Sequence, residues 1–95
     1  MARRERELVR VKLGAIEFDQ WFHDIDLGLW MLTLKRVPVE IGERCLELAK
    51  SVKADPFPIA LQSDTMTYRL ESQRAWFGVV CYNARENFYE ITIDL

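Results

Sequence analysis

The residues that could do chemistry are few and scattered along the chain. His23 is the one histidine of the sequence, and it lies beside Asp24 and Asp26. A metal site needs three or four ligands at defined spacing, and no second histidine, CxxC or HxxxH motif is present to complete such a set. A lone histidine at the end of a predicted helix more often interacts with the terminal carbonyl groups. The sequence therefore predicts no metal site and no catalytic role at His23.

The cysteines, serines and glycines also lack the context that catalysis needs. Cys45 falls on the inner stripe of a predicted helix and Cys81 in an apolar predicted strand, so we expect both thiols to be buried and unreactive. No serine lies in a nucleophile-elbow motif, and the four glycines are isolated, so no phosphate-binding loop forms. We therefore predict that the protein is not an enzyme and takes no cofactor and no small-molecule substrate.

Size and composition favour one packed domain over residues 1–95. The chain has 95 residues, and 49% of them are hydrophobic, which is typical of a globular domain of this length. Two cysteines make no disulfide framework, and neither a signal peptide nor a membrane-spanning stretch is recognisable. The sequence therefore predicts a soluble protein of a reducing compartment, with no membrane partner.

The first half of the chain reads as a strand followed by helices. The stretch LVRVKL (residues 8–13) alternates apolar and basic residues, as a half-buried strand does. Two stretches after it carry apolar residues at helical spacing and predict two short helices. The first stripe is Phe18, Trp21, Phe22 and Ile25; the second, with Asp26 as N-cap, is Leu27, Trp30, Met31 and Leu34.

Pro38 stands where these stripes lead into a longer one. Proline is tolerated at the start of a helix, where its missing N–H would have no partner. The pattern therefore predicts a new helix from Pro38 to about Lys53, with one continuous helix kinked at Pro38 as the alternative. Its inner stripe is Ile41, Cys45, Leu48 and Val52.

The rest of the chain reads as a loop and three strands. The prolines of ADPFPIALQSD predict a loop that Phe57 and Ile59 attach to the core. TMTYRLE, AWFGVVCY and FYEITIDL predict strands separated by turns at SQR and NAREN, with AWFGVVCY covered on both faces. The expected fold class is α+β: an antiparallel sheet of about four strands with two to three helices on one face, in the order β-α-α-α-β-β-β.

The charge is unevenly distributed. The formal net charge is −2, but residues 1–12 contain five basic and two acidic side chains, so they carry +3 and the remainder −5. Residues 1–7 therefore form a basic N-terminal arm that could touch an acidic surface or nucleic acid. Because the body is acidic, we expect at most a passing contact with nucleic acid.

The order of these elements resembles that of the tail-completion and head-to-tail connector proteins of tailed bacteriophages. The resemblance rests on the opening strand VRVKL, on LTLKRVP leading into the long helix, and on the closing strand FYEI. In that family a Leu-rich helix ends in a Lys/Arg–apolar–Pro joint, which residues 34–38 match. This chain departs from the family in two places. It lacks a Thr-Gly turn after the long helix, and it carries Thr92 where a glycine usually follows the aromatic–Glu pair of the closing strand.

The resemblance implies a structural virion protein, assembled in the host cytoplasm, that forms a ring at the neck of the virion. Its partners would be copies of itself and neighbouring neck or tail proteins, joined through exposed strand edges at residues 8–13 or 88–95. The interface residues it implies are Arg3, Arg4 and Arg6 in the arm, and Trp76, Tyr82, Phe88, Tyr89 and Glu90 in the closing strands.

Two other functions stay open on the sequence. The first is a small acidic inhibitor, phage-encoded, that blocks a host protein through Asp19, Asp24 and Asp26 beside Trp21. The second is a nucleic-acid-binding module that uses the basic arm alone.

Overall fold

The computed structural model describes residues 7–51, 55–64 and 69–95. In this part of the chain seven strands form one antiparallel sheet in the order β2-β1-β5-β6-β7-β4-β3, accompanied by one α-helix and one short 3-10 helix. In chain order the elements are β1 (Leu8–Leu13), β2 (Ile16–Trp21), η2 (Phe22–Asp24), β3 (Ile25–Leu27), β4 (Met31–Val37), α1 (Val39–Ser51), β5 (Phe57–Ser63), β6 (Arg69–Asn83) and β7 (Phe88–Asp94).

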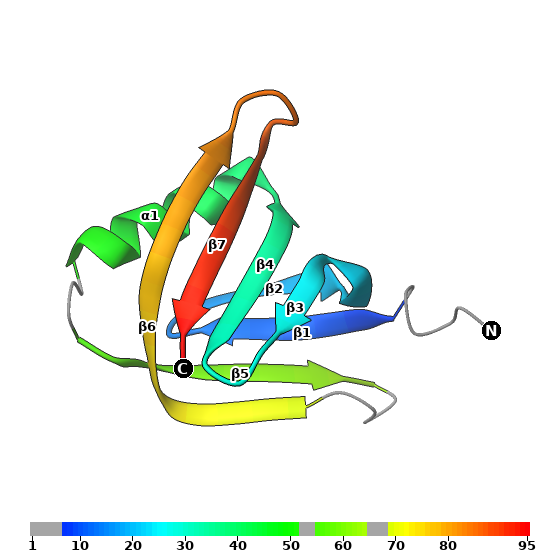
Figure 1. Ribbon diagram of the computed structural model, residues 1–95, viewed down its shortest axis with the longest axis vertical. Coiled ribbons are helices and arrows are strands. Elements are labelled where there is room, and N and C mark those ends of the chain that lie inside the picture. Colours follow the sequence, from blue (N-terminus) through cyan, green and yellow to red (C-terminus); the bar gives the residue numbers. More distant parts are fainter. Residues whose placement is uncertain (1–6, 52–54, 65–68) are drawn as a thin grey trace.

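The sheet bends into two halves that share β6. The first part of this long strand pairs with β5, which continues to β1 and β2, and its second part pairs with β7, which continues to β4 and β3. The two groups of strands run in clearly different directions, and β6 curves from one into the other (Figure 1). The inner faces of the two halves can therefore pack on each other within one chain.

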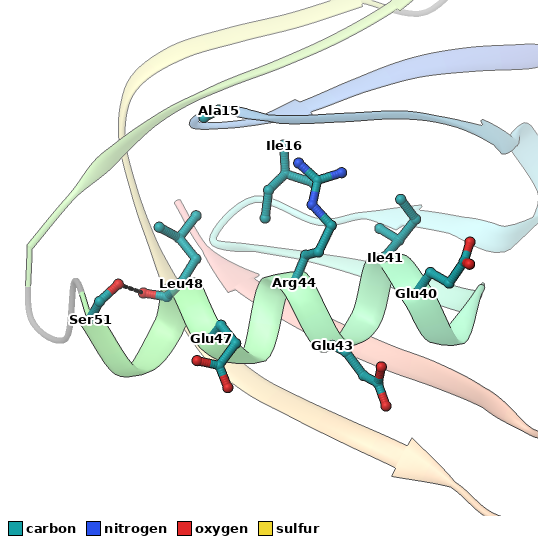
Figure 2. A pocket seen from close by; sticks show the side chains of 9 residues that line it. All are labelled: Ala15, Ile16, Glu40, Ile41, Glu43, Arg44, Glu47, Leu48 and Ser51. Atoms are coloured by element: carbon teal, nitrogen blue, oxygen red, sulfur yellow. Dashed lines mark hydrogen bonds between the residues drawn. The ribbon is translucent and has the colours of Figure 1, made fainter.

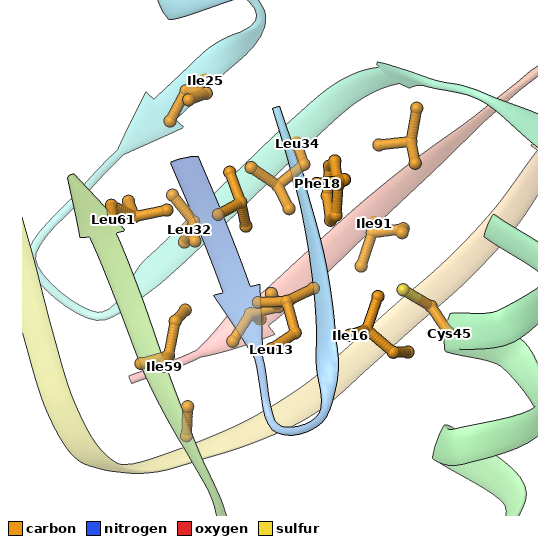
Figure 3. Close-up of a cluster of buried hydrophobic side chains, with 14 of the residues drawn as sticks. Leu13, Ile16, Phe18, Ile25, Leu32, Leu34, Cys45, Ile59, Leu61 and Ile91 are labelled. Atoms are coloured by element: carbon orange, nitrogen blue, oxygen red, sulfur yellow. The ribbon is translucent and has the colours of Figure 1, made fainter. Parts of the chain in front are cut away.

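The core lies between these inner faces. Alternate residues of β1 and β5 are buried from one half, and alternate residues of β4 and β7 from the other. Figure 3 shows Cys45 of α1 pointing toward Ile16 and Ile91 at the side of this core. The largest fully buried side chains are Leu13, Leu32, Leu34, Leu61, Ile91 and Ile93.

Helix α1 begins at the proline that divides the first half of the chain. Gly42 N donates to Pro38 O at 2.9 Å, so Pro38 supplies the first helical acceptor and lies at the N-terminal cap. The predicted helix after Pro38 is confirmed as Val39–Ser51, and the kinked continuous helix is wrong because Met31–Val37 is strand β4. The helix contacts β2, β6 and β7 and lies beside the sheet.

The predicted α+β fold class is wrong, because the two helices expected between residues 15 and 34 are strands. Ile16–Trp21 is β2, and residues 25–37 form the β3–β4 hairpin, with only the three-residue η2 between. Gln20 at an inner position and Trp21 at an outer one hide the alternation of β2, since Gln20 is buried and donates its side-chain amide to Lys35 O. The Leu-rich helix of the phage resemblance is therefore absent from this position.

Two expectations about the second half also fail. The proline-rich segment predicted as a loop is strand β5, although Phe57 and Ile59 are buried as expected. Pro58 is tolerated there because the pairing of β5 with β6 shifts register between Phe57 and Ile59, and prolines within sheets favour such irregularities. The predicted turn SQR is the middle of the continuous strand β6. The predicted strand TMTYRLE falls mostly outside the described residues.

Candidate functional site

The turn between β3 and β4 carries the most exposed apolar side chains of the described chain. Leu29 is 85% exposed and Trp30 is 77% exposed, and Met31 beside them is half-exposed. The turn is held by two backbone hydrogen bonds: Gly28 N donates to Met31 O at 2.8 Å, and Leu95 N donates to Trp30 O at 2.9 Å. Because both bonds fix the backbone, the exposed side chains lie on an ordered turn beside the end of β7.

The outer face of the sheet extends this apolar surface. Met31 of β4 and Trp76 of β6 both pair with Asp94 of the strand between them, so the two side chains flank Asp94 on one face, about 10 Å apart. Trp76 is partly buried, and Val79, which is exposed, follows it on this face after the bulge in β6. We call Leu29, Trp30, Met31, Trp76 and Val79 the tip patch. Exposed apolar groups gathered in this way mark interaction surfaces.

The structure brings one of the predicted interface residues, Trp76, to the tip patch. The other predicted interface residues of the closing strands lie at the opposite end of the β6–β7 hairpin; they are Tyr82, Phe88, Tyr89 and Glu90. Tyr82 is exposed and donates its hydroxyl to Asn87 Oδ1 at 2.6 Å, and its ring centroid lies 5.3 Å from that of the buried Tyr89. Phe88, Tyr89 and Glu90 line a small cavity of about 250 Å³. Tyr89 is thus mainly a core residue, whereas Tyr82 and Glu90 are accessible.

The strand edges expected to pair with other subunits are interior. Strand β1 lies between β2 and β5, and β7 lies between β6 and β4, so the backbone of each is paired on both sides. The ends of the sheet order are β2 and the three-residue β3. Arg3, Arg4 and Arg6 lie outside the described residues.

The carboxylates proposed as an acidic epitope all have cationic partners. Asp19 accepts from Arg10 Nε at 2.8 Å, and Asp26 lies 3.0 Å from Lys35 Nζ. The side chain of Asp24 is only 5% exposed and is paired with Arg36. These residues therefore form neutralised ion pairs on and below the surface, which weakens the case for an acidic inhibitor.

A second surface feature is a groove of about 860 Å³ between α1 and the β1–β2 turn. Its apolar floor is made by Ile16, Ile41 and Leu48, and the Arg44 side chain projects from α1 toward Ile16 (Figure 2). Three glutamates of α1 also line the groove, so with Arg44 its charged side chains sum to −2. These glutamates are Glu40, Glu43 and Glu47. We call this feature the α1 groove.

The metal-ligating side chains and the two thiols of the described residues do not gather in one place. No three His, Cys, Asp or Glu side chains of residues 7–51, 55–64 and 69–95 are close enough to hold a metal ion together. Cys45 is buried as predicted, but Cys81 is exposed, because AWFGVVCY is covered on one face only. None of the described helices has the length and apolar character needed to cross a membrane.

The sequence missed Leu29 and Trp30 as surface residues. The helical spacing predicts Trp30 on the inner stripe of a helix, whereas the structure has a turn between β3 and β4 there. The usable signal was Gly28 between two leucines, because an isolated glycine in an apolar run also fits a turn between two short strands.

Comparison with protein-family models, curated proteins and solved structures gives no match for this chain. The tip patch and the α1 groove are therefore the features from which a function can be inferred.

Proposed function

We propose that the protein is a non-enzymatic structural subunit that assembles with other copies of itself, and that the tip patch is an assembly surface. The observation that carries this proposal is the exposure of Leu29 and Trp30 on a backbone-fixed turn. Burying one exposed leucine or tryptophan side chain contributes roughly 1.5–3 kcal/mol. An ordered turn adds to this contribution, because little conformational entropy is lost on binding.

The edge strand beside this turn supports self-association. Strand β3 ends the sheet order and leads directly into the tip, so its outer backbone groups have no strand partner among the described residues. A second copy could extend the sheet there while the two tip patches cover each other. Such a contact is self-complementary, as most interfaces between identical chains are.

The phage interpretation is a narrower form of this proposal. A head-to-tail connector or tail-completion subunit would assemble into a ring at the virion neck and bind neighbouring neck and tail proteins. This narrower proposal is supported by the resemblance of the opening strand, the Pro38 joint and the closing strand to those of the phage proteins. The Leu-rich helix of those proteins does not contribute to the support, because it is absent here. Assembly can be tested independently of this narrower proposal.

Sedimentation velocity of the purified chain over about 1–200 μM tests the assembly, in the range where weak and moderate interfaces dissociate. We expect an oligomer whose population rises with concentration. The double variant Leu29→Ser and Trp30→Ser should shift the equilibrium toward monomer by about tenfold or more, because two large apolar side chains leave the interface.

The matched control is Leu8→Ser, which removes a half-exposed leucine at the start of β1, away from the tip (Figure 1). It should leave the association unchanged. A wild-type chain that stays monomeric over the whole range would overturn the proposal, as would a tip variant that associates like the wild type.

A further inference from the structure

The α1 groove combines an apolar floor with an acidic rim, and this combination selects the chemistry of its occupant. Ile16, Ile41 and Leu48 offer apolar surface, whereas the lining glutamates outnumber Arg44 by three to one. A segment that fits both the apolar floor and the acidic rim needs side chains with long aliphatic stems that end in a positive charge. Arginine has this form, since its methylene groups can cover apolar surface while its guanidinium group pairs with carboxylates.

The sequence holds one segment of this chemistry outside the described residues. Residues 1–6, MARRER, contain three arginines and one glutamate. We propose that this N-terminal segment of one copy occupies the α1 groove of a neighbouring copy, with Arg3, Arg4 and Arg6 paired to the glutamates of α1. The inference rests on the proposed self-assembly and assigns it a second contact.

The position of the first described residues favours a neighbouring copy over the same chain. Leu8 pairs with Trp21, and Glu7 O accepts from Phe22 N at 2.8 Å, which fixes the end of the arm at the open end of the β1–β2 hairpin. Ala15 and Ile16 of the groove lie at the closed end of this hairpin, about 17 Å away along β1. Six residues span at most about 20 Å, so the arm of the same chain reaches the end of the groove beside Ala15 and Leu48 only when fully extended, whereas the arm of a neighbouring copy can enter the groove at either end.

An arm that enters a neighbour's groove makes a contact between two different surfaces. Contacts of this kind generate closed rings when the rotation between copies closes, and open filaments when it does not. The arm and the groove therefore give the ring proposal a specific interface, one that is electrostatic and separate from the tip patch.

Charge reversal with rescue tests this contact. The arm-reversed chain carries Arg3→Glu, Arg4→Glu and Arg6→Glu, and the groove-reversed chain carries Glu43→Lys and Glu47→Lys, both at exposed positions of α1. By sedimentation, each chain alone should associate at least about tenfold more weakly than the wild type, since several exposed ion pairs change from attraction to repulsion. A chain carrying both sets should recover the wild-type association, which would not happen if either set simply unfolded the protein.

Two further measurements distinguish the possible failures. The matched control, Asp64→Lys with Glu86→Lys, makes the same charge change at exposed positions outside the groove and should leave association unchanged. Raising NaCl from about 0.05 to 0.5 M should weaken the association of the wild type but not that of the arm-reversed chain, which has no attractive arm contacts to screen. A wild-type oligomer that is indifferent to both reversals overturns this inference alone, whereas a wild-type monomer overturns the proposed function and this inference together.

Discussion

Gly42 of α1 lies directly against the side chain of Tyr89 in β7. A Cβ atom added at residue 42 would come within 2.6 Å of Tyr89 Cβ and would overlap the ring. Tyr89 cannot easily move away, because it is buried and its ring is tilted against that of Tyr82. The absence of a side chain at residue 42 thus sets how closely the helix approaches the sheet, and with it the position of the α1 groove.

We expect Gly42→Ala to lower the free energy of unfolding by about 1–2 kcal/mol. Overpacking a filled core costs about 1–3 kcal/mol, and the better helix propensity of alanine returns at most about 1 kcal/mol. Urea denaturation measures the change. The exposed neighbour substitution Glu43→Ala should shift the midpoint little, and the penalty at residue 42 should shrink in a Tyr89→Ala background, because the two sites contact each other. An equal penalty in both backgrounds would contradict the proposed clash.

Arg36 combines a buried ion pair with an unfavourable backbone conformation. It pairs with the buried carboxylate of Asp24, and its φ of 54° lies in the left-handed region. We expect Arg36→Ala to destabilise the fold by about 1–3 kcal/mol, less than a fully buried pair because Arg36 itself is half-exposed. Arg36→Gly should be about 1 kcal/mol more stable than Arg36→Ala, since glycine adopts positive φ without strain.

Thermal or urea unfolding of the two Arg36 variants makes this comparison. Lys35→Ala serves as the control, because its ion pair with Asp26 is exposed on both sides and should contribute less than about 0.5 kcal/mol. Equal stabilities of the glycine and alanine variants would show that the backbone strain at residue 36 is negligible.

The two thiols should differ in reactivity and in their effect on stability. Burial raises the pKa of Cys45 to about 11 from an ordinary value of 9.0, with Arg44 opposing the shift, whereas Cys81 is exposed. Between these two values the thiolate forms more readily in the unfolded chain, so stability should fall as the pH rises from 9.0 to about 11. Iodoacetamide at pH 8 should modify Cys81 alone in the folded protein, as read by mass spectrometry.

The control for the pH effect is Cys45→Ala, which should remove this part of the stability decrease above pH 9.0. The comparison is made between slopes against pH, because the alanine also leaves a small cavity. Modification of Cys45 at the same rate as Cys81 would contradict its burial.

Where one periodicity dominated, the sequence determined the local structure. The alternation in residues 8–13 and 88–94 gave β1 and β7 with the expected buried faces, and Pro38 marked the start of α1. These elements could be predicted because each has a single buried face, and no polar residue interrupts the apolar pattern of that face. The sequence also identifies residues 1–7 as basic and the closing strand as largely apolar.

Tertiary structure alone decided the fold class and the location of the site. Residues four apart share a face in both a helix and a strand, but the steps of three from Phe18 to Trp21 and from Met31 to Leu34 fit a helix only, so the local spacing favoured helices where the structure has strands. The strand prevailed because its partners lie far along the chain: β4 pairs with β7, and Gln20 of β2 finds its acceptor at Lys35 of β4. The tip patch likewise exists only because that pairing brings Met31 and Trp76 to either side of Asp94, a juxtaposition that long-range register alone creates.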